Sequence, residues 1–304
     1  INQSRHADYR GMGRRRTLRR ERSPSRFFRF FRRSQNRDFR LARGAAIRMV
    51  FRRTVLCVRD RRMTSGSRRL FTTGASKHDK IKTAMQNWSI EVTPPSFAKL
   101  LEKKPADFRL GDILPAGTAV NVTYLPGSDS NDTVSVCERI YKDGMRPVPH
   151  VAARSIQGRD HLDGYLAALQ ERASVDEVLV VGGGVDQPKG PYHESMQILE
   201  SGVLQKYGVR SVGLACHPEG SPDIGDAALA DALARKNAWA TEQLESGSLD
   251  RVYLETQFFF EANPIIEWER HIWKEGNRLP VRLGVAGPTS IKGLIKFAAM
   301  SGVG

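Results

Sequence analysis

The sequence predicts an α/β fold, a (β/α)8 TIM barrel that lacks its eighth βα unit and follows a disordered basic N-terminal leader. Short apolar runs alternate strictly with helical patterns from Trp88 onward, and the runs begin about every thirty to forty residues. Polar and glycine residues cluster just after the runs. Seven such units fit a barrel better than an open doubly wound sheet, and the clusters would then share its C-terminal face. We expect a leader over 1–80 and a barrel over 81–304.

The leader is the first feature along the chain. Residues 1–80 hold 25 Lys and Arg against 5 Asp and Glu, whereas the remainder holds 23 basic and 28 acidic residues. Basic, hydroxyl-bearing and acid-poor N-termini suit organelle import, so we expect a transit peptide and the mitochondrial matrix, or the cytoplasm if the leader is not a genuine transit peptide. Two alternatives stay open. One is an arginine-rich arm that binds RNA, and the other is translated upstream sequence, because the chain begins with Ile1.

Charge and cysteine content narrow the function of the barrel. The net charge of the barrel is mildly negative, so no nucleic-acid partner is expected for it. Cys57, Cys137 and Cys216 form no CxxC pair and no metal-ligand spacing, which gives no support to a disulfide framework or a zinc site. No run of about eighteen apolar residues occurs, so no membrane span is expected.

The predicted strands are short apolar runs, as strands buried on both faces should be. They are residues 89–93, 119–124, 147–152, 177–182, 211–217, 251–258 and 281–287. The helical patterns between and after them cover residues 96–104, 133–143, 159–172, 192–206, 226–246, 264–275 and 290–301. The eighth unit is missing, which suggests a truncated C-terminus or a strand supplied from elsewhere. An open barrel would expose two unpaired strand edges.

The sixth run ends in an amide followed by aromatic rings: Gln257, then Phe258, Phe259 and Phe260. Rings gain more free energy inside a core than beside a polar amide. The pattern therefore suits a flat ligand that the amide hydrogen-bonds and a ring stacks upon. The alternative is that the rings only plug the end of the barrel.

Two titratable residues lie within or at the end of predicted strands. Glu91 interrupts a buried run, where a carboxylate is rare unless it is paired or functional. A buried carboxyl can donate a proton near neutral pH, and the alternative is an ion pair with a neighbouring strand. His150 could hydrogen-bond a ring carbonyl or a phosphate, although a lone histidine is more often structural.

Two loops after strands could grip a cofactor. Gly183, Gly184 and Asp186 lie in a flexible loop that lacks a GxGxxG fingerprint. His217 and Glu219 lie in the loop after the fifth run, where a polar cofactor contact fits better than a metal. On the next helix, the cations at positions 235 and 236 could reach an anionic group, and a solvated helix face is the alternative.

Read together, these segments resemble the methylenetetrahydrofolate reductase family, which consists of flavin-dependent (β/α)8 barrels. The resemblance covers 88–304, and any one of its segments alone is weak. The matching segments, in chain order, are Ser89-Ile90-Glu91 with Pro94-Pro95, Val122-Thr123-Tyr124, Pro149-His150, His217-Pro218-Glu219-Gly220, Thr256-Gln257-Phe258-Phe259-Phe260 and Gly284-Val285-Ala286-Gly287-Pro288.

The resemblance implies reduction of 5,10-methylenetetrahydrofolate to 5-methyltetrahydrofolate, in one-carbon metabolism and methionine biosynthesis. It implies FAD as cofactor, NAD(P)H as electron donor, folate as substrate and a possible homo-oligomer. The implied roles are Glu91 as general acid, Thr123 and His150 as flavin contacts, Glu219 in the loop bordering the flavin, Arg235 and Lys236 at its phosphates, Gln257 as the pterin-binding amide, and Phe258 and Phe260 beside the substrate.

Two segments depart from the family pattern. In the loop after the fifth run, His217 and Ser221 replace the Tyr and the His of the family's Tyr-Pro-Glu-x-His pattern. Members of the family carry Leu-Arg-Gly-Asp where this chain has Val181-Gly182-Gly183-Gly184, and Asp186 would have to substitute for the missing acid. Flavin binding is therefore a firmer expectation than nicotinamide-driven turnover. The rival hypothesis is a barrel that binds folate or flavin without turnover, as a sensor or a subunit of a complex.

Overall fold

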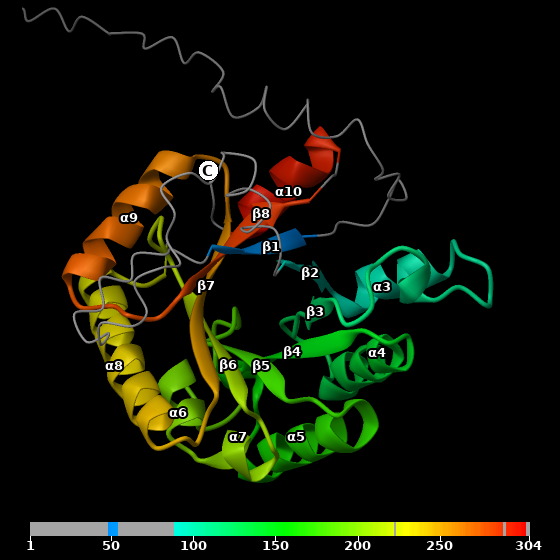
Figure 1. Ribbon diagram of the computed structural model, residues 1–304, viewed down its shortest axis with the longest axis horizontal. Coiled ribbons are helices and arrows are strands. Elements are labelled where there is room, and N and C mark those ends of the chain that lie inside the picture. The colour runs from blue at the N-terminus through cyan, green and yellow to red at the C-terminus, as the bar shows by residue number, and fades with distance from the viewer. Residues whose placement is uncertain (1–47, 54–87, 222, 288–289, 302–304) are drawn as a thin grey trace, which may run out of the picture. The chain divides into compact units, whose positions relative to one another are not determined.

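The computed structural model describes residues 48–53, 88–221, 223–287 and 290–301. It is an α/β fold in which seven parallel strands alternate with helices and curl into one sheet (Figure 1). The seven predicted strands are confirmed, with ends shifted by a few residues. The parallel strands are β2 (Trp88–Val92), β3 (Ala119–Val122), β4 (Arg146–Ala152), β5 (Glu177–Val181), β6 (Ser211–Cys216), β7 (Arg251–Phe259) and β8 (Val281–Ala286).

An eighth strand, β1 (Arg48–Arg53), completes the sheet from within the segment expected to be a leader. It runs antiparallel to both β2 and β8, and the hydrogen-bonded ladder therefore closes. Pairing both edges removes the exposed backbone donors and acceptors that an open seven-stranded sheet would present. The expectation of a disordered leader therefore does not hold for these six residues. The rest of 1–80 lies outside the described residues.

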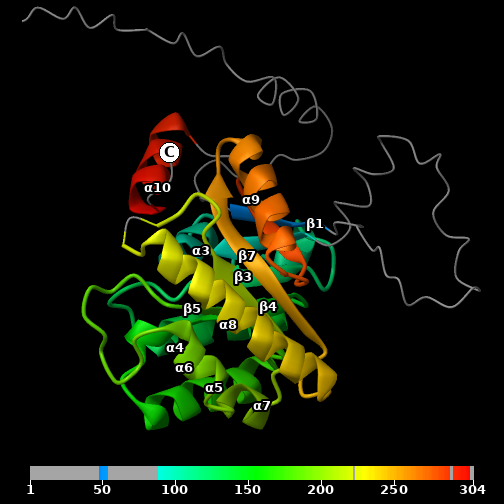
Figure 2. The same ribbon diagram turned by 90° about the vertical axis from the view of Figure 1, so that its left-hand side faces the viewer.

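The helices lie on the outside of the sheet, and Figure 2 shows α8 crossing it next to β7. They are α3 (Pro94–Leu101), α4 (Ser130–Lys142), α5 (Arg159–Ala173), α6 (Ser195–Leu199), α7 (Val203–Lys206), α8 (Asp226–Glu245), α9 (Ala262–Lys274) and α10 (Ile291–Ser301), with 3-10 turns η1 (Leu110–Asp112) and η2 (Ala153–Ser155). Side chains cap the first turns of α3, α4 and α10. The hydroxyl of Thr93 accepts from the Ser96 amide, the carboxylate of Asp129 from the Asn131 amide, and the hydroxyl of Ser290 from the Gly293 amide.

One helix prediction was wrong. The pattern over 192–206 predicted a single helix, but the structure has two short ones, α6 and α7. The chain breaks at Gly202, whose φ of +68° lies in the left-handed region. An apolar pattern records which side chains are buried, and it can run across a turn that keeps the same side facing the sheet.

The main hydrophobic core fills the layer between the sheet and the helices, where β3 is buried along its whole length. The inside of the sheet is polar at the amino ends of the strands. There the fully buried Glu177 accepts hydrogen bonds from Arg146 at 2.7 Å and Tyr253 at 2.8 Å, and it pairs with Arg251 and Arg282. Burial alone would raise the pKa of Glu177, but these guanidinium groups outweigh burial and hold it below its usual value.

Candidate active site

The centre of the candidate site is a contact between two residues singled out in the sequence. Glu91 on β2 and His150 on β4 face the inside of the sheet, and Glu91 Oε2 lies 3.6 Å from His150 Nε2. Their side chains are only 13% and 8% exposed, respectively. The carboxyl group and the imidazole therefore form one partly water-excluded pair across strands, and a functional role of Glu91 stays a prediction.

The backbone around this pair is held firmly. The Tyr165 hydroxyl on α5 donates a hydrogen bond to the His150 carbonyl at 3.0 Å. Burial raises the pKa of Tyr165 well above its usual value, so the phenol keeps the proton that it donates. The Tyr165 ring also meets Tyr124 edge to face, with centroids 5.7 Å apart. His150 is thus fixed from the helix layer behind it.

Asn121 and Glu255 continue the polar interior beside the pair. Asn121 stands opposite Glu91 in the β2–β3 register, and its Nδ2 donates to Glu255 Oε1 at 2.7 Å across the sheet. Both residues are buried. Sequence reasoning missed them, although Glu255 carries the signal that identified Glu91, a carboxylate inside an apolar run.

Thr123 follows β3 directly and lies next to the end of β2. Its amide donates to the Val92 carbonyl at 3.0 Å. Its hydroxyl is buried and has no hydrogen-bond partner among the residues that the structure describes. Because a buried hydroxyl without a partner costs free energy, an unmet hydrogen bond remains at this point.

The glycine loop after β5 lies beside the end of β4. A Cβ on Gly183, whose φ is +96°, would stand 3.4 Å from the Cβ of Ala152. Ala152 is two residues beyond His150 on the same face of β4, so the loop borders the mouth of the sheet above the imidazole. The Asp186 side chain is exposed, and its backbone carbonyl accepts from Arg154 at 2.6 Å.

The loop after β6 brings His217 and Glu219 to the same end of the sheet. His217 is half-buried, and burial, followed by the charge of Lys236, lowers its pKa. It is therefore neutral at pH 7 and can accept a hydrogen bond at one ring nitrogen. Glu219 is exposed at the surface, but part of its carboxyl group is shielded from water. This shielding, followed by the charge of Glu261, raises its pKa.

Arg235 and Lys236, expected to meet an anionic group, are engaged within the protein. Arg235 donates to both carboxylate oxygens of Glu194, at 2.8 and 3.1 Å. Lys236 is buried, and its Nζ donates to the Ala215 carbonyl at 2.7 Å. Burial lowers the pKa of this lysine. These contacts tie α8 to the sheet and to the β5–α6 loop, and they give no support to a phosphate-binding role.

The aromatic end of β7 divides into two parts. Phe258 is buried and Phe260 is 37% exposed, and the two rings meet edge to face at 5.7 Å. Gln257 is half-buried, at a register shift between β7 and β8, and its Oε1 accepts from the Phe258 amide at 3.2 Å. One ring therefore fills the core, while Phe260 and the Gln257 amide lie closer to solvent.

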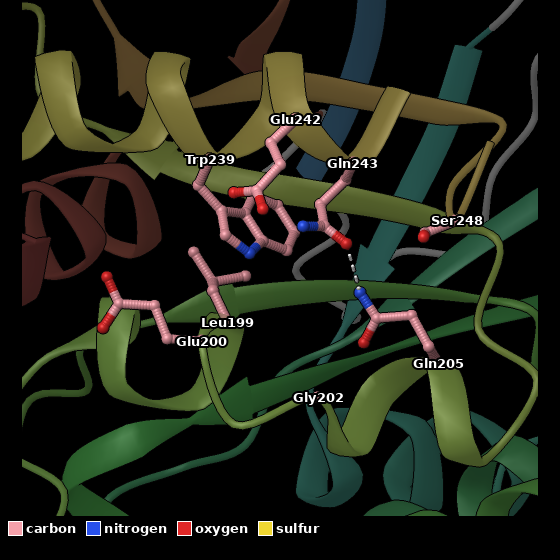
Figure 3. Close-up of a pocket in the computed structure, with 8 residues that line it drawn as sticks. All are labelled: Leu199, Glu200, Gly202, Gln205, Trp239, Glu242, Gln243 and Ser248. Carbon is pink, nitrogen blue, oxygen red and sulfur yellow. Dashed lines mark hydrogen bonds between the residues drawn. The ribbon is translucent and has the colours of Figure 1, made fainter. Parts of the chain in front are cut away.

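A cavity among the described residues lies away from these side chains. It has a volume of about 320 Å³ and lies between α8 and the α6–α7 segment, outside the sheet (Figure 3). Gln205 Nε2 donates to Gln243 Oε1 at 3.0 Å beside the mostly buried Trp239. None of the residues expected to be functional lines it, so we place the candidate site at the carboxyl ends of the strands.

Two further findings concern metals and membranes. Among residues 48–53, 88–221, 223–287 and 290–301, no group of three or more His, Cys, Asp or Glu could hold a metal ion. Within the same ranges, no helix has the length and apolar character needed to cross a membrane.

No model of a known protein family matches the chain.

Proposed function

We propose that the protein is a flavin-dependent reductase that converts 5,10-methylenetetrahydrofolate into 5-methyltetrahydrofolate. The observation that carries the proposal is the contact between Glu91 and His150, which the fold brings together from separate strands. A shielded acid–base pair at the carboxyl ends of parallel strands is where this architecture places its chemistry. The family resemblance supplies the substrate class.

The side chains around the pair fit the ring system of a flavin. The buried Thr123 hydroxyl needs a partner, the neutral His217 can accept a hydrogen bond, and Gly183 offers backbone without a side chain. The phosphate end fits less well, because Arg235 and Lys236 have partners inside the protein. Bound FAD would supply hydride chemistry, with NAD(P)H as the proposed electron donor.

In this proposal the residues of the chain bind and orient the folate and control one proton. Glu91 holds a proton at its carboxyl group and gives it to the bridge nitrogen outside the pterin ring. The bond from that nitrogen to the methylene carbon then breaks, and the carbon stays on the pterin nitrogen as the methyl group of the product. His150, 3.6 Å away, fixes the direction of that carboxyl. Gln257 offers its amide to the pterin edge, and the exposed Phe260 offers a ring face.

The test is the change Glu91→Gln, which keeps the size of the side chain and removes the transferable proton. Folate reduction should slow by about a hundredfold or more, while flavin reduction by the nicotinamide donor stays unchanged. Stopped-flow absorbance measures the two half-reactions separately. Glu102→Gln, an exposed change at the end of α3, is the matched control. Normal folate reduction by Glu91→Gln would show that the assigned acid is wrong.

The rival function is a barrel that binds flavin or folate without turnover. The internal contacts of Arg235 and Lys236 favour the folate-binding form of this rival, because they leave a dinucleotide cofactor without the cations expected at its phosphates. Flavin that binds but is neither reduced by NADH or NADPH nor reoxidised by methylenetetrahydrofolate would decide for this rival.

A further inference from the structure

The loop over residues 182–190, between β5 and α6, is held by one arginine from the neighbouring unit. Arg154 lies in η2, directly after β4. Its Nε donates to the Val185 carbonyl at 2.9 Å and its Nη2 donates to the Asp186 carbonyl at 2.6 Å. A guanidinium group is well suited to this task because its donors are fixed in one plane and permanently charged.

The backbone of Arg154 holds the same loop at two more points. Its amide donates to the Gly182 carbonyl at 2.9 Å, and its carbonyl accepts from the Lys189 amide at 2.9 Å. The far end of the loop is also tightly packed. A Cβ on Gly190 would lie only 2.3 Å from the Gln157 carbonyl oxygen. The loop that the sequence suggested to be flexible is thus fixed to the β4–α5 connection at both ends and in its middle.

The position of the loop gives this arrangement a consequence for the site. A Cβ added to Gly183 would meet Ala152, which is on the same face of β4 as His150, and one added to Gly184 would meet Pro126 in the β3–α4 connection. The loop therefore forms the edge of the mouth beside the acid–base pair. Because this wall is already fixed before the ligand arrives, binding does not have to pay the entropic cost of ordering a loop.

We propose that Arg154 is a positioning residue that fixes residues 182–190 as a preformed wall of the site. The role in ligand binding rests on the proposed flavin function, whereas the fixing of the loop does not. The two parts are therefore tested by separate measurements on the full chain.

The first measurement is hydrogen–deuterium exchange without ligand, read on peptides that cover 182–190. Arg154→Gln should raise the exchange rate across the loop about tenfold or more, because two charge-assisted hydrogen bonds are lost. The exchange rate of Arg154→Lys should lie between those of Arg154→Gln and the unchanged chain, because one ammonium group replaces the planar guanidinium group. Arg159→Gln is the matched control, since Arg159 lies at the start of α5 and pairs with Asp163 instead. Equal exchange in Arg154→Gln and Arg159→Gln would overturn the proposal.

The second measurement is titration with FAD and with FMN, followed by flavin absorbance. Arg154→Gln should bind about tenfold more weakly than the unchanged chain, with the unfolding midpoint kept at the value of Arg159→Gln. Gly190→Ala disturbs the same loop by steric contact and should weaken binding in the same direction. A loosened loop with unchanged flavin affinity would overturn the role in the site. If the unchanged chain binds no flavin, the proposed function fails, and the exchange measurement still decides whether Arg154 fixes the loop.

Discussion

At the residue scale, burial sets the charge of the groups around the mouth. His217 is half-buried, and burial followed by the nearby Lys236 charge lowers its pKa. His161, which accepts from the Gln157 amide at the start of α5, has its pKa lowered by burial as well. Both imidazoles are therefore neutral near pH 7, so the unfolded chain takes up protons before the folded one does.

This difference predicts how stability depends on pH. The stabilising effect of a neutral His217 is present above its unfolded pKa of about 6.5 and is lost as the pH falls through its lower folded pKa. His217→Gln should therefore lose less free energy of unfolding than the unchanged chain between about pH 7.5 and about pH 5.5. Urea unfolding of His217→Gln and of the unchanged chain at both pH values measures this loss. Both proteins contain His161, so its contribution cancels in the comparison. An identical loss in both would contradict the burial of His217.

The sequence singles out candidate site residues when their type conflicts with their surroundings. Glu91 was found because a carboxylate interrupts an apolar run, and its contact with His150 agrees with that argument. Arg154 could not be found, because its partners are backbone carbonyls, which leave no trace in the sequence. Arg235 and Lys236 looked available on a helix, but their partners, Glu194 and the Ala215 carbonyl, are distant in the chain.

At the element scale, the strands were predictable and their internal packing was not. Each strand is a short apolar run because helices cover the outside of the sheet. On the inside, however, β6 carries Gly213 where Tyr253 of β7 crosses towards Glu177. The apolar pattern says nothing of such a match, because it depends on which large side chain comes from the neighbouring strand.

Gly213→Ala tests this packing. The added Cβ would lie 2.7 Å from the end of the Tyr253 ring and 2.8 Å from Leu179. Tyr253 cannot easily move, since its hydroxyl binds Glu177 and the Arg282 guanidinium lies 3.6 Å over its ring. We expect the change to destabilise the protein by about 1–3 kcal/mol, measured by urea unfolding.

The control for this change is Gly164→Ala, within α5. An added Cβ there meets no atom within 4 Å, so the better helix propensity of alanine should stabilise the protein by about 0.5–1 kcal/mol. Equal effects of the two changes would mean that the interior of the sheet has room at Gly213.

At the scale of the whole molecule, the sequence predicted that two strand edges would lack partners, but it did not predict which segment pairs with them. The sequence showed seven units and two edges without partners, and the structure closes them with β1. The segment of β1 reads Arg-Met-Val-Phe-Arg-Arg, within an arginine-rich stretch. Its pairing depends on the edges that β2 and β8 offer, so its own pattern could not predict it.

Two truncations test the role of β1. The unit that contains the sheet begins at Arg43, so removal of residues 1–42 should leave the thermal unfolding midpoint of that unit unchanged. Removal of residues 1–53 also takes β1 away and exposes both sheet edges. That protein should unfold at a lower temperature and self-associate, as measured by calorimetry and light scattering. Equal midpoints for the two truncations would contradict the closure by β1.

The measurement that bears most directly on the central claim is a titration of the purified chain with FAD, followed by absorbance. If a flavin lies at the mouth of the sheet, FAD should stay with the protein through gel filtration with a shifted spectrum. Thr123→Val should bind it about tenfold more weakly, because the buried hydroxyl loses its ligand partner. Thr241→Val, on the exposed side of α8, should bind it normally. Protein that passes through the column without flavin, or equal affinity in all three proteins, would contradict the account.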